Sequence, residues 1–318
     1  MTTFKASAIY RPVKKFGKKI VAITVASVLT LSGSLFAAPI QAAQISTYES
    51  LPLASTSASL SSGLYSSNAI LIRMSDGQIL MTKNINQRVY PASMTKMMTA
   101  LVALENISNL QAKTTLPASM FAPLEKQGAS MAGFKRGEKV KAIDLLYGSM
   151  LPSGADASVG LTYAAAGSQA AFVKKMNQKA KQLGMKHTHF TNVTGLPDPQ
   201  HYTTVKDMSI LMKAALKNTT FRKLITTHTY SMSPTNLHPK GMTVKSTLSE
   251  SASTLQFKGG KILGGKTGYT SAAGLCLASI ASINGKEYML VTANAKGNPW
   301  TPPYHIQDAL KVYGKVKN

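Results

Sequence analysis

Ser93 and Lys96 are the two residues whose types and spacing could do chemistry together. They stand in the segment Pro91–Leu104, whose second half is rich in strong helix formers and apolar on all sides. Residues three apart share one face of a helix, so the hydroxyl and the amine come within reach of each other. A serine attacks when a neighbour accepts its proton, and a lysine accepts one only if burial or another cation keeps it neutral. The sequence therefore predicts a nucleophile–base pair at the start of a buried helix, where the helix dipole favours developing negative charge.

Two later stretches place polar side chains beside small residues. The triplet Ser153-Gly154-Ala155 lies between two predicted helices, and Lys266-Thr267-Gly268 follows a pair of glycines. A lysine and a hydroxyl beside glycines suit an edge strand that a ligand approaches closely. Each stretch by itself is more typical of a cap, a solvated lysine or a strand end. Their order, S-x-x-K, S-x-x and K-T-G, is that of the motif set of penicillin-binding proteins and β-lactamases.

The elements that must position these residues are predicted from periodicity and turn residues. Asp76-Gly77, between the apolar runs 68–73 and 79–83, indicates a β-hairpin. After Thr219, Ser, Thr and β-branched residues become frequent, and strands are expected. Because strands lie at both ends and helices in the middle, we predict an α/β (α+β) fold in which an antiparallel sheet pairs the two ends around a helical insertion. Helices are predicted over 142–151, 155–166, 170–183, 205–216 and 306–313, and C-terminal strands over 275–283 and 286–294, around Asn284-Gly285.

Composition bounds the class of protein. The chain has 318 residues, 44% of them hydrophobic, which is enough for one large domain or two modest ones. The single cysteine, Cys276, excludes an internal disulfide and stands in an apolar run, so a buried inert thiol is predicted. Neither C-x-x-C nor H-E-x-x-H occurs, and the six histidines make no ligand pattern. We therefore expect neither a metal nor a cofactor.

Residues 1–43 have the pattern of an export signal. A basic region ending at Lys19 precedes an apolar run from Ile20 to about Ile40, and Ala42 and Ala43 offer small residues for signal peptidase. The alternative is a retained membrane anchor, because the run approaches the ~20 residues that span a bilayer. Either way the body of the protein is expected outside the cytoplasm. Residues 44–65, rich in Ser, Thr and Ala, are predicted to be a flexible lead-in.

The chain is strongly basic, with a net charge of +24. Without the six cations of the signal region, 30 basic residues face 12 acidic ones, which leaves +18. Such an excess indicates an anionic environment, and anionic cell-wall polymers are candidate partners. Nucleic acid is a disfavoured partner, because the protein is expected to be exported and its sequence has no nucleic-acid recognition motif. The lysines are scattered, so the charge predicts a solvated surface and no particular site.

Further residues extend the motif set. From about Asn68 to Asn294 the chain resembles the serine-type D-alanyl-D-alanine carboxypeptidases, the low-molecular-mass penicillin-binding proteins. The resemblance implies a DD-peptidase/β-lactamase-like fold, with one catalytic domain over 66–318 and no room for the second β-rich domain of many relatives. A monomer, secreted or associated with the cell wall, is expected. The resemblance rests on Pro91–Lys96, Asp144–Gly148, Leu151–Gly154, Phe172–Asn177, Leu183–Met185, Thr188–Phe190, Thr194–Asp198 and Gly265–Thr270.

The resemblance also implies roles for the motif residues. Ser93 is the acylated nucleophile, Lys96 is its proton acceptor, and Ser153 helps to pass protons to the leaving D-alanine. The implied substrate is a peptidoglycan stem peptide ending in D-Ala-D-Ala, and β-lactams would acylate the same serine. Lys266 and Thr267 would bind the substrate's terminal carboxylate. The implied oxyanion hole uses the backbone N–H of Ser93 and that of Tyr269 or Thr270. The implied substrate-binding strand comprises Lys266, Thr267, Gly268, Tyr269 and Thr270.

One position departs from the family pattern. The second motif of the family reads Ser-x-Asn, and Ala155 stands in place of the asparagine that would bond the substrate amide and help to hold the lysine. The alternatives left open are a wall-binding protein that has lost catalysis and a DD-endopeptidase or transpeptidase. A β-lactamase is disfavoured, because Glu250 is the only glutamate between the second and third motifs and is poorly placed.

Four polar residues near the motifs are assigned structural roles. Asp156 is predicted to cap the helix that follows it. His189 and Asp198 are not needed by the mechanism, and His201 is expected on a surface loop.

Overall fold

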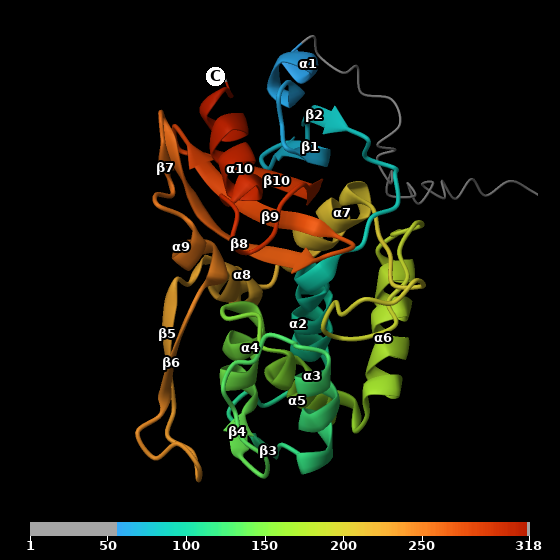
Figure 1. Ribbon diagram of the computed structural model, residues 1–318, viewed down its shortest axis with the longest axis vertical. Coiled ribbons are helices and arrows are strands. Elements are labelled where there is room, and N and C mark those ends of the chain that lie inside the picture. The colour runs from blue at the N-terminus through green and yellow to red at the C-terminus, as the bar shows by residue number, and fades with distance from the viewer. Residues whose placement is uncertain (1–55, 317–318) are drawn as a thin grey trace, which may run out of the picture. The chain divides into compact units, whose positions relative to one another are not determined.

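Six antiparallel strands form the central sheet of the computed structural model, which describes residues 56–316 (Figure 1). Their spatial order is β2-β1-β10-β9-β8-β7, so the first and last long strands of the chain lie side by side. Ser66 pairs with Ala295 and Ile70 with Val291. The strands are β1 (Ser66–Arg73), β2 (Ile79–Lys83), β7 (Gln256–Phe257), β8 (Gly260–Thr270), β9 (Gly274–Ile283) and β10 (Lys286–Ala295).

Side chains alternate between the two faces of the sheet along each strand, and both faces are covered. Ile70 and Ile72 of β1 belong to one buried cluster, whereas Ala69 and Leu71 belong to another. Helices α1 (Thr56–Ser61) and α10 (Tyr304–Gly314) cover the second face, and α7 (Val205–Ala215) and α8 (Thr219–Thr226) pack against the first. The sheet therefore separates two apolar cores.

Helix α2 (Thr95–Asn106) is the centre of the helical region (Figure 1). Every residue from Thr95 to Ala103 is buried, as the apolar sequence predicts. Around α2 lie α4 (Ala142–Met150), α5 (Ala155–Ala166) and α6 (Gln169–Gln182). Because α2 also contacts α7 and α8 under the sheet, its first turn lies where the two regions meet.

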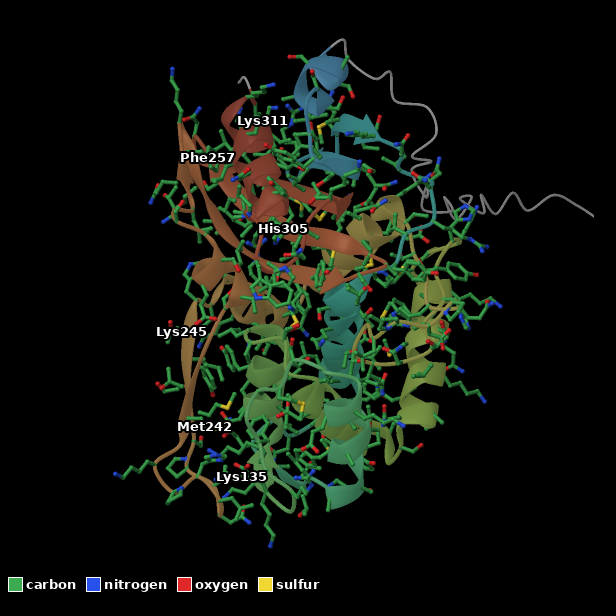
Figure 2. All side chains as sticks on the ribbon, in the orientation of Figure 1. Lys135, Met242, Lys245, Phe257, His305 and Lys311 are labelled. Carbon is green, nitrogen blue, oxygen red and sulfur yellow. The ribbon has the colours of Figure 1, made fainter. Side chains whose placement is uncertain are left out.

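A hairpin of β5 (Thr229–Met232) and β6 (Met242–Lys245) runs along the helical region, and Figure 2 shows Lys245 and Met242 along it. Tyr230 of the hairpin stacks on Tyr147, with ring centroids 3.5 Å apart. The remaining elements are short: η1 (Ala92–Met94), β3 (Lys113–Thr115), η2 (Ala118–Met120), α3 (Phe121–Lys126), β4 (Lys139–Lys141) and α9 (Thr247–Ser251).

The α+β prediction is confirmed, including the pairing of the two ends. Asn284 and Gly285 both have positive φ, 48° and 81°, as a two-residue hairpin turn requires. Helix α8 was missed, because its region was expected to hold strands. It forms because the side chain of Asn218 accepts a hydrogen bond from Phe221 N–H, and Phe221, Leu224 and Ile225 are buried on one side.

The expected lead-in is also corrected where the structure describes it. Thr56–Ser61 form α1, and Leu60 and Leu64 are buried in the core beneath α10. The predicted export signal lies outside the described residues. Among residues 56–316, no helix is both long enough and apolar enough to cross a membrane.

Candidate active site

Ser93 lies in the short 3₁₀ turn η1, directly before α2. The preceding Ala92 has a positive φ of 46°, a conformation that costs free energy and persists only when its surroundings hold it. Gly195 contributes to that restraint: a Cβ atom there would lie 1.8 Å from the Ala92 carbonyl oxygen. The loop before Pro197 therefore passes directly over the turn that carries Ser93, which only glycine allows.

The Lys96 amine reaches both the serine and this loop. Its Nζ donates to Ser93 Oγ at 3.0 Å and to the Thr194 carbonyl oxygen at 2.7 Å, and the residue is 2% exposed. Burial lowers the pKa of Lys96 to about 7, although the charge of Asp156 acts in the opposite direction. At neutral pH a substantial fraction of the amine is thus uncharged, with a lone pair available to the Ser93 proton.

Lys266 forms a second lysine–serine pair. Its Nζ donates to Ser153 Oγ and to the Thr267 carbonyl oxygen, both at 3.0 Å, and its side chain is fully buried. Burial, and after it the charge of Lys96, holds the pKa of Lys266 well below its ordinary value. Ser153 has a positive φ of 64° on the loop between α4 and α5. An anion bound beside Lys266 would favour the charged form of the amine.

The strand with the K-T-G motif lies on a free edge, as the glycines suggested. Strand β7 pairs with β8 only at Gly260 and Lys261, so no described strand pairs with the outer side of Lys266–Thr270. A Cβ atom on Gly268 would lie 3.0 Å from the backbone nitrogen of Ser93, which shows how closely β8 passes this serine. Thr267 Oγ1 is hydrogen-bonded to Thr247 Oγ1 at 2.6 Å. Thr247, from α9, carried no signal in the sequence.

Asp156 does not act mainly as the predicted helix cap. Its carboxyl group accepts hydrogen bonds from three backbone N–H groups of the 132–134 loop, besides the bond from Ala157 N–H at 2.9 Å. The loop donors are Ala132 at 2.7 Å and Gly133 and Phe134 at 3.1 Å.

Ala155 holds the same loop through its backbone, because its N–H donates to the Ser130 carbonyl oxygen at 2.7 Å. Together Ala155 and Asp156 hold Ser130, a residue that the sequence did not single out, beside Ser93.

Replacing Asp156 by asparagine is expected to lower the free energy of unfolding by about 2–3 kcal/mol. The amide –NH₂ group would face backbone N–H groups of Gly133 and Phe134 and leave them unsatisfied. Denaturant unfolding measures the change. Asp198→Asn is the control, because its carboxylate accepts from Gln200 N–H on an exposed loop. Equal destabilisation by both variants would contradict the anchoring role.

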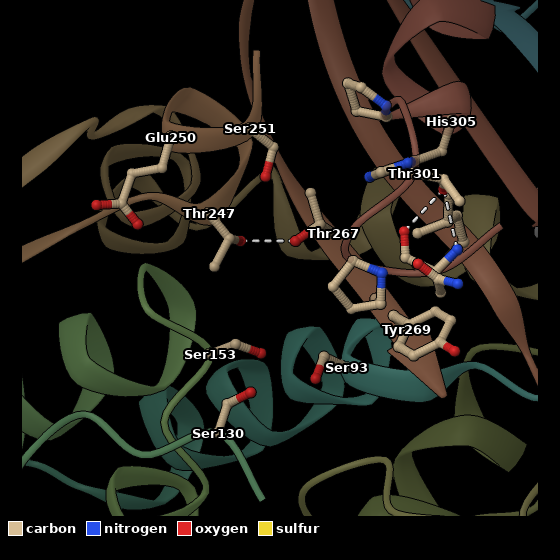
Figure 3. Close-up of a pocket in the computed structure, with 15 residues that line it drawn as sticks. Ser93, Ser130, Ser153, Thr247, Glu250, Ser251, Thr267, Tyr269, Thr301 and His305 are labelled. Atoms are coloured by element: carbon tan, nitrogen blue, oxygen red, sulfur yellow. Dashed lines mark hydrogen bonds between the residues drawn. The ribbon is translucent and has the colours of Figure 1, made fainter. Parts of the chain in front are cut away.

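Ser93 lies between two hollows. The larger has a volume of about 480 Å³ and the smaller about 250 Å³, and Ser93, Ser130 and Tyr269 line both. Figure 3 shows the larger, with Glu250 beyond Thr247 at one end and His305 at the other. Its lining also includes Ser153, Ser251, Thr267, Gly268, Asn298, Pro299, Thr301 and Pro303. The smaller is lined, among others, by Lys96, Ala155, Gly195, Leu196, Thr270 and Ser271.

Other predicted residues lie as follows. His201 was expected on the surface but is 1% exposed, because its ring is bonded to Thr95 Oγ1 at 2.8 Å and to Thr191 N–H at 3.0 Å. Cys276 is buried, as predicted, and burial raises the pKa of its thiol to about 12. His189 is exposed on its loop, away from the lining of both hollows.

The chain is similar to known DD-peptidases. The family model of Peptidase_S11, D-alanyl-D-alanine carboxypeptidase, matches residues 55–297. D-alanyl-D-alanine carboxypeptidase DacF of Bacillus subtilis is 36% identical over 214 residues, 67% of this chain and 53% of that protein. The D-alanyl-D-alanine carboxypeptidase of Streptomyces sp. strain K15 is 34% identical over 217 residues, 66% of this chain and 74% of that protein.

A solved DD-peptidase structure has a fold similar to that of this chain. The crystal structure of the Streptomyces K15 DD-transpeptidase superposes with a TM-score of 0.69 at 31% identity, over 79% of this chain and 97% of that one. The matched segment of the present chain spans only about half of the B. subtilis relative. The family match covers most of the chain and contains all three motifs. The chain therefore belongs to the Peptidase_S11 family of D-alanyl-D-alanine carboxypeptidases.

Proposed function

We propose that the protein is a serine D-Ala-D-Ala carboxypeptidase that removes the terminal D-alanine from peptidoglycan stem peptides. The observation that carries the proposal is the contact of 3.0 Å between Lys96 Nζ and Ser93 Oγ, with the lysine buried and its pKa near neutrality. A buried, neutral amine beside a hydroxyl is the requirement for an activated serine.

In the first step Ser93 Oγ attacks the carbonyl carbon of the penultimate D-alanine, and its proton passes to Lys96 Nζ. The N–H of Ser93 and one from Tyr269 or Thr270 stabilise the oxyanion. The amide C–N bond then breaks, and the leaving amine takes a proton by way of Ser153.

Two groups place the substrate for this step. Lys266, behind Ser153, and the hydroxyl of Thr267 would meet the terminal carboxylate with a cation and a donor. After D-alanine leaves, water hydrolyses the ester on Ser93. β-Lactams would form the same ester and persist longer, and the mature enzyme would act outside the cytoplasm after export directed by residues 1–43.

Two measurements on the full chain test the proposal. The first is D-alanine release from diacetyl-L-lysyl-D-alanyl-D-alanine, and the second is mass spectrometry of a penicillin adduct on the peptide that contains Ser93. Release together with the adduct supports a carboxypeptidase and shows that Ala155 is tolerated. An adduct without release points to another acceptor or leaving group. Neither release nor adduct, from a folded protein, would overturn the proposal in favour of a wall-binding protein.

A further inference from the structure

The loop 191–195 contacts the Lys96 amine directly. The Thr194 carbonyl oxygen accepts the hydrogen bond of 2.7 Å from Lys96 Nζ, and Gly195 lies over the turn that carries Ser93. When the amine is uncharged, one N–H group points to this carbonyl, and the lone pair is left for the Ser93 proton. The position of the loop therefore sets the direction of the lone pair.

The loop has a defined shape of its own. The side-chain oxygen of Asn192 accepts from Thr194 N–H at 3.1 Å, from Thr194 Oγ1 at 3.0 Å and from Gly195 N–H at 2.8 Å. A turn closed by an asparagine side chain in this way behaves as one unit. Thr99 of α2 adds an attachment, because its Oγ1 donates to the Val193 carbonyl oxygen at 2.7 Å. Any group that fixes the loop to α2 therefore also fixes the Thr194 carbonyl.

His201 joins the loop to the first turn of α2. Its Nδ1 atom accepts from Thr191 N–H at 3.0 Å, and its Nε2 atom lies 2.8 Å from Thr95 Oγ1. Thr95 begins α2 and stands between Ser93 and Lys96 in the sequence. The two ends of the imidazole thus contact the two parts of the site whose relative position the Ser93 proton transfer requires.

The ring bridges these parts in one orientation. Burial lowers the pKa of His201 to about 4, although the charge of Asp198 acts in the opposite direction, so the imidazole is uncharged at neutral pH. Because Thr191 N–H donates to Nδ1, the single ring proton lies on Nε2 and is donated to Thr95 Oγ1. Phe190 packs edge-on against the ring, with 5.6 Å between the centroids. Both nitrogens and one edge of the ring are therefore held.

We propose that His201 is a positioning residue for the Ser93–Lys96 pair. It holds the 191–195 loop against α2, and the Thr194 carbonyl of that loop holds the amine. The inference rests on the proposed function and adds to it a residue that touches neither the substrate nor the reacting atoms. His201 exchanges no proton in the reaction. It acts by keeping the amine within reach of the serine, because a displacement of about 1 Å can cost 10²-fold in rate.

Two replacements of His201 test the inference. Single-turnover acylation by a fluorescent penicillin gives the limiting rate and the half-saturating concentration separately. His201→Leu removes both ring nitrogens, and the limiting rate should fall by about 10- to 100-fold. The half-saturating concentration should change little, because the larger hollow, where Thr267 lies, has no lining residue between 191 and 201 in the described chain. His201→Gln, which keeps a donor and an acceptor, should restore most of the rate.

Thr95→Val tests the same connection from the side of α2. It replaces the hydroxyl by a methyl group and leaves the ring its bond to Thr191, so the limiting rate should fall by less than in His201→Leu. The double variant should be no slower than His201→Leu alone, because both changes break one connection. His189→Leu is the matched control, since this exposed ring contacts the Gln200 carbonyl oxygen and lies away from α2; its rate should equal that of the wild type.

The inference is overturned if His201→Leu acylates as fast as the wild type, or if the losses multiply in the double variant. Equal losses in His201→Leu and His201→Gln would overturn it as well. Denaturant unfolding shows which variants are folded; if His201→Leu is not, an unchanged rate in Thr95→Val overturns the inference. A wild type that gives neither D-alanine release nor a penicillin adduct rejects the proposed function. A wild type that gives both, beside an unimpaired His201→Leu, rejects only the role of His201.

Discussion

Ser93→Ala is expected to abolish D-alanine release, with a fall of roughly 10⁶-fold in turnover. The variant lacks the hydroxyl that Lys96 Nζ contacts at 3.0 Å, and among residues 56–316 the amine then keeps only its hydrogen bond to the Thr194 carbonyl oxygen, at 2.7 Å. The ester intermediate then cannot form, and the remaining groups can only position substrate. D-Alanine release and mass spectrometry of the penicillin adduct measure the loss. Because a hydroxyl-to-hydrogen change removes one atom from a half-buried site, the fold should persist.

Ser231→Ala is the matched control, since Ser231 lies exposed on β5, and its activity should equal that of the wild type. A penicillin adduct that survives in Ser93→Ala on another residue would show that the nucleophile has been assigned wrongly.

Lys96→Met should slow acylation by about 10²–10⁴-fold, the usual contribution of a general base. Methionine has similar length and no amine, so the Ser93 proton has no acceptor. The fold should tolerate the change, because a buried amine is replaced by an apolar group. Stopped-flow measurement of penicillin acylation gives the rate. Lys217→Met, at an exposed position, is the control and should leave the rate unchanged.

The pH profile of acylation tests whether Lys96 acts as a base or only fills space beside Ser93. Below its pKa of about 7 the Lys96 amine carries a proton and cannot accept another, so the wild-type rate should rise with pH and level off above about 7. The profile of Lys96→Met should lack this rise. A wild-type rate that stays flat from pH 5 to 8 would contradict the role of Lys96 as base.

Local signals sufficed for much of the fold and for part of the site. Asn284-Gly285 specifies its own turn, and the Ser93–Lys96 pair needs only helical spacing, so both follow from neighbours in sequence. The helices over 142–151 and 155–166 were predicted within one residue of their ends. Helix α8 was missed because β-branched composition outweighed the short apolar repeat behind Asn218.

Contacts between distant segments could not be predicted in this way. Asp156 begins a helix, where an aspartate usually binds the nearest N–H groups, yet most of its bonds go to the 132–134 loop. Thr247 joins the site only because α9 packs beside β8. His201 looked like a loop residue, and its burial depends on Thr95 from α2. In each case the partner lies more than a helix away along the chain.

The pairing of β1 with β10 has a consequence for how the molecule is made. Ser66 of β1 pairs with Ala295 of β10. Nearly the whole domain must therefore leave the ribosome before β1 can pair with β10. The residues of α2 and of the helices around it precede β10 in the chain and are synthesised before it. Closing such a long loop makes folding slow, and until then β1 keeps an unpaired apolar edge. Assembly of the Ser93 site, which needs both β8 and α2, is thus one of the last events of folding.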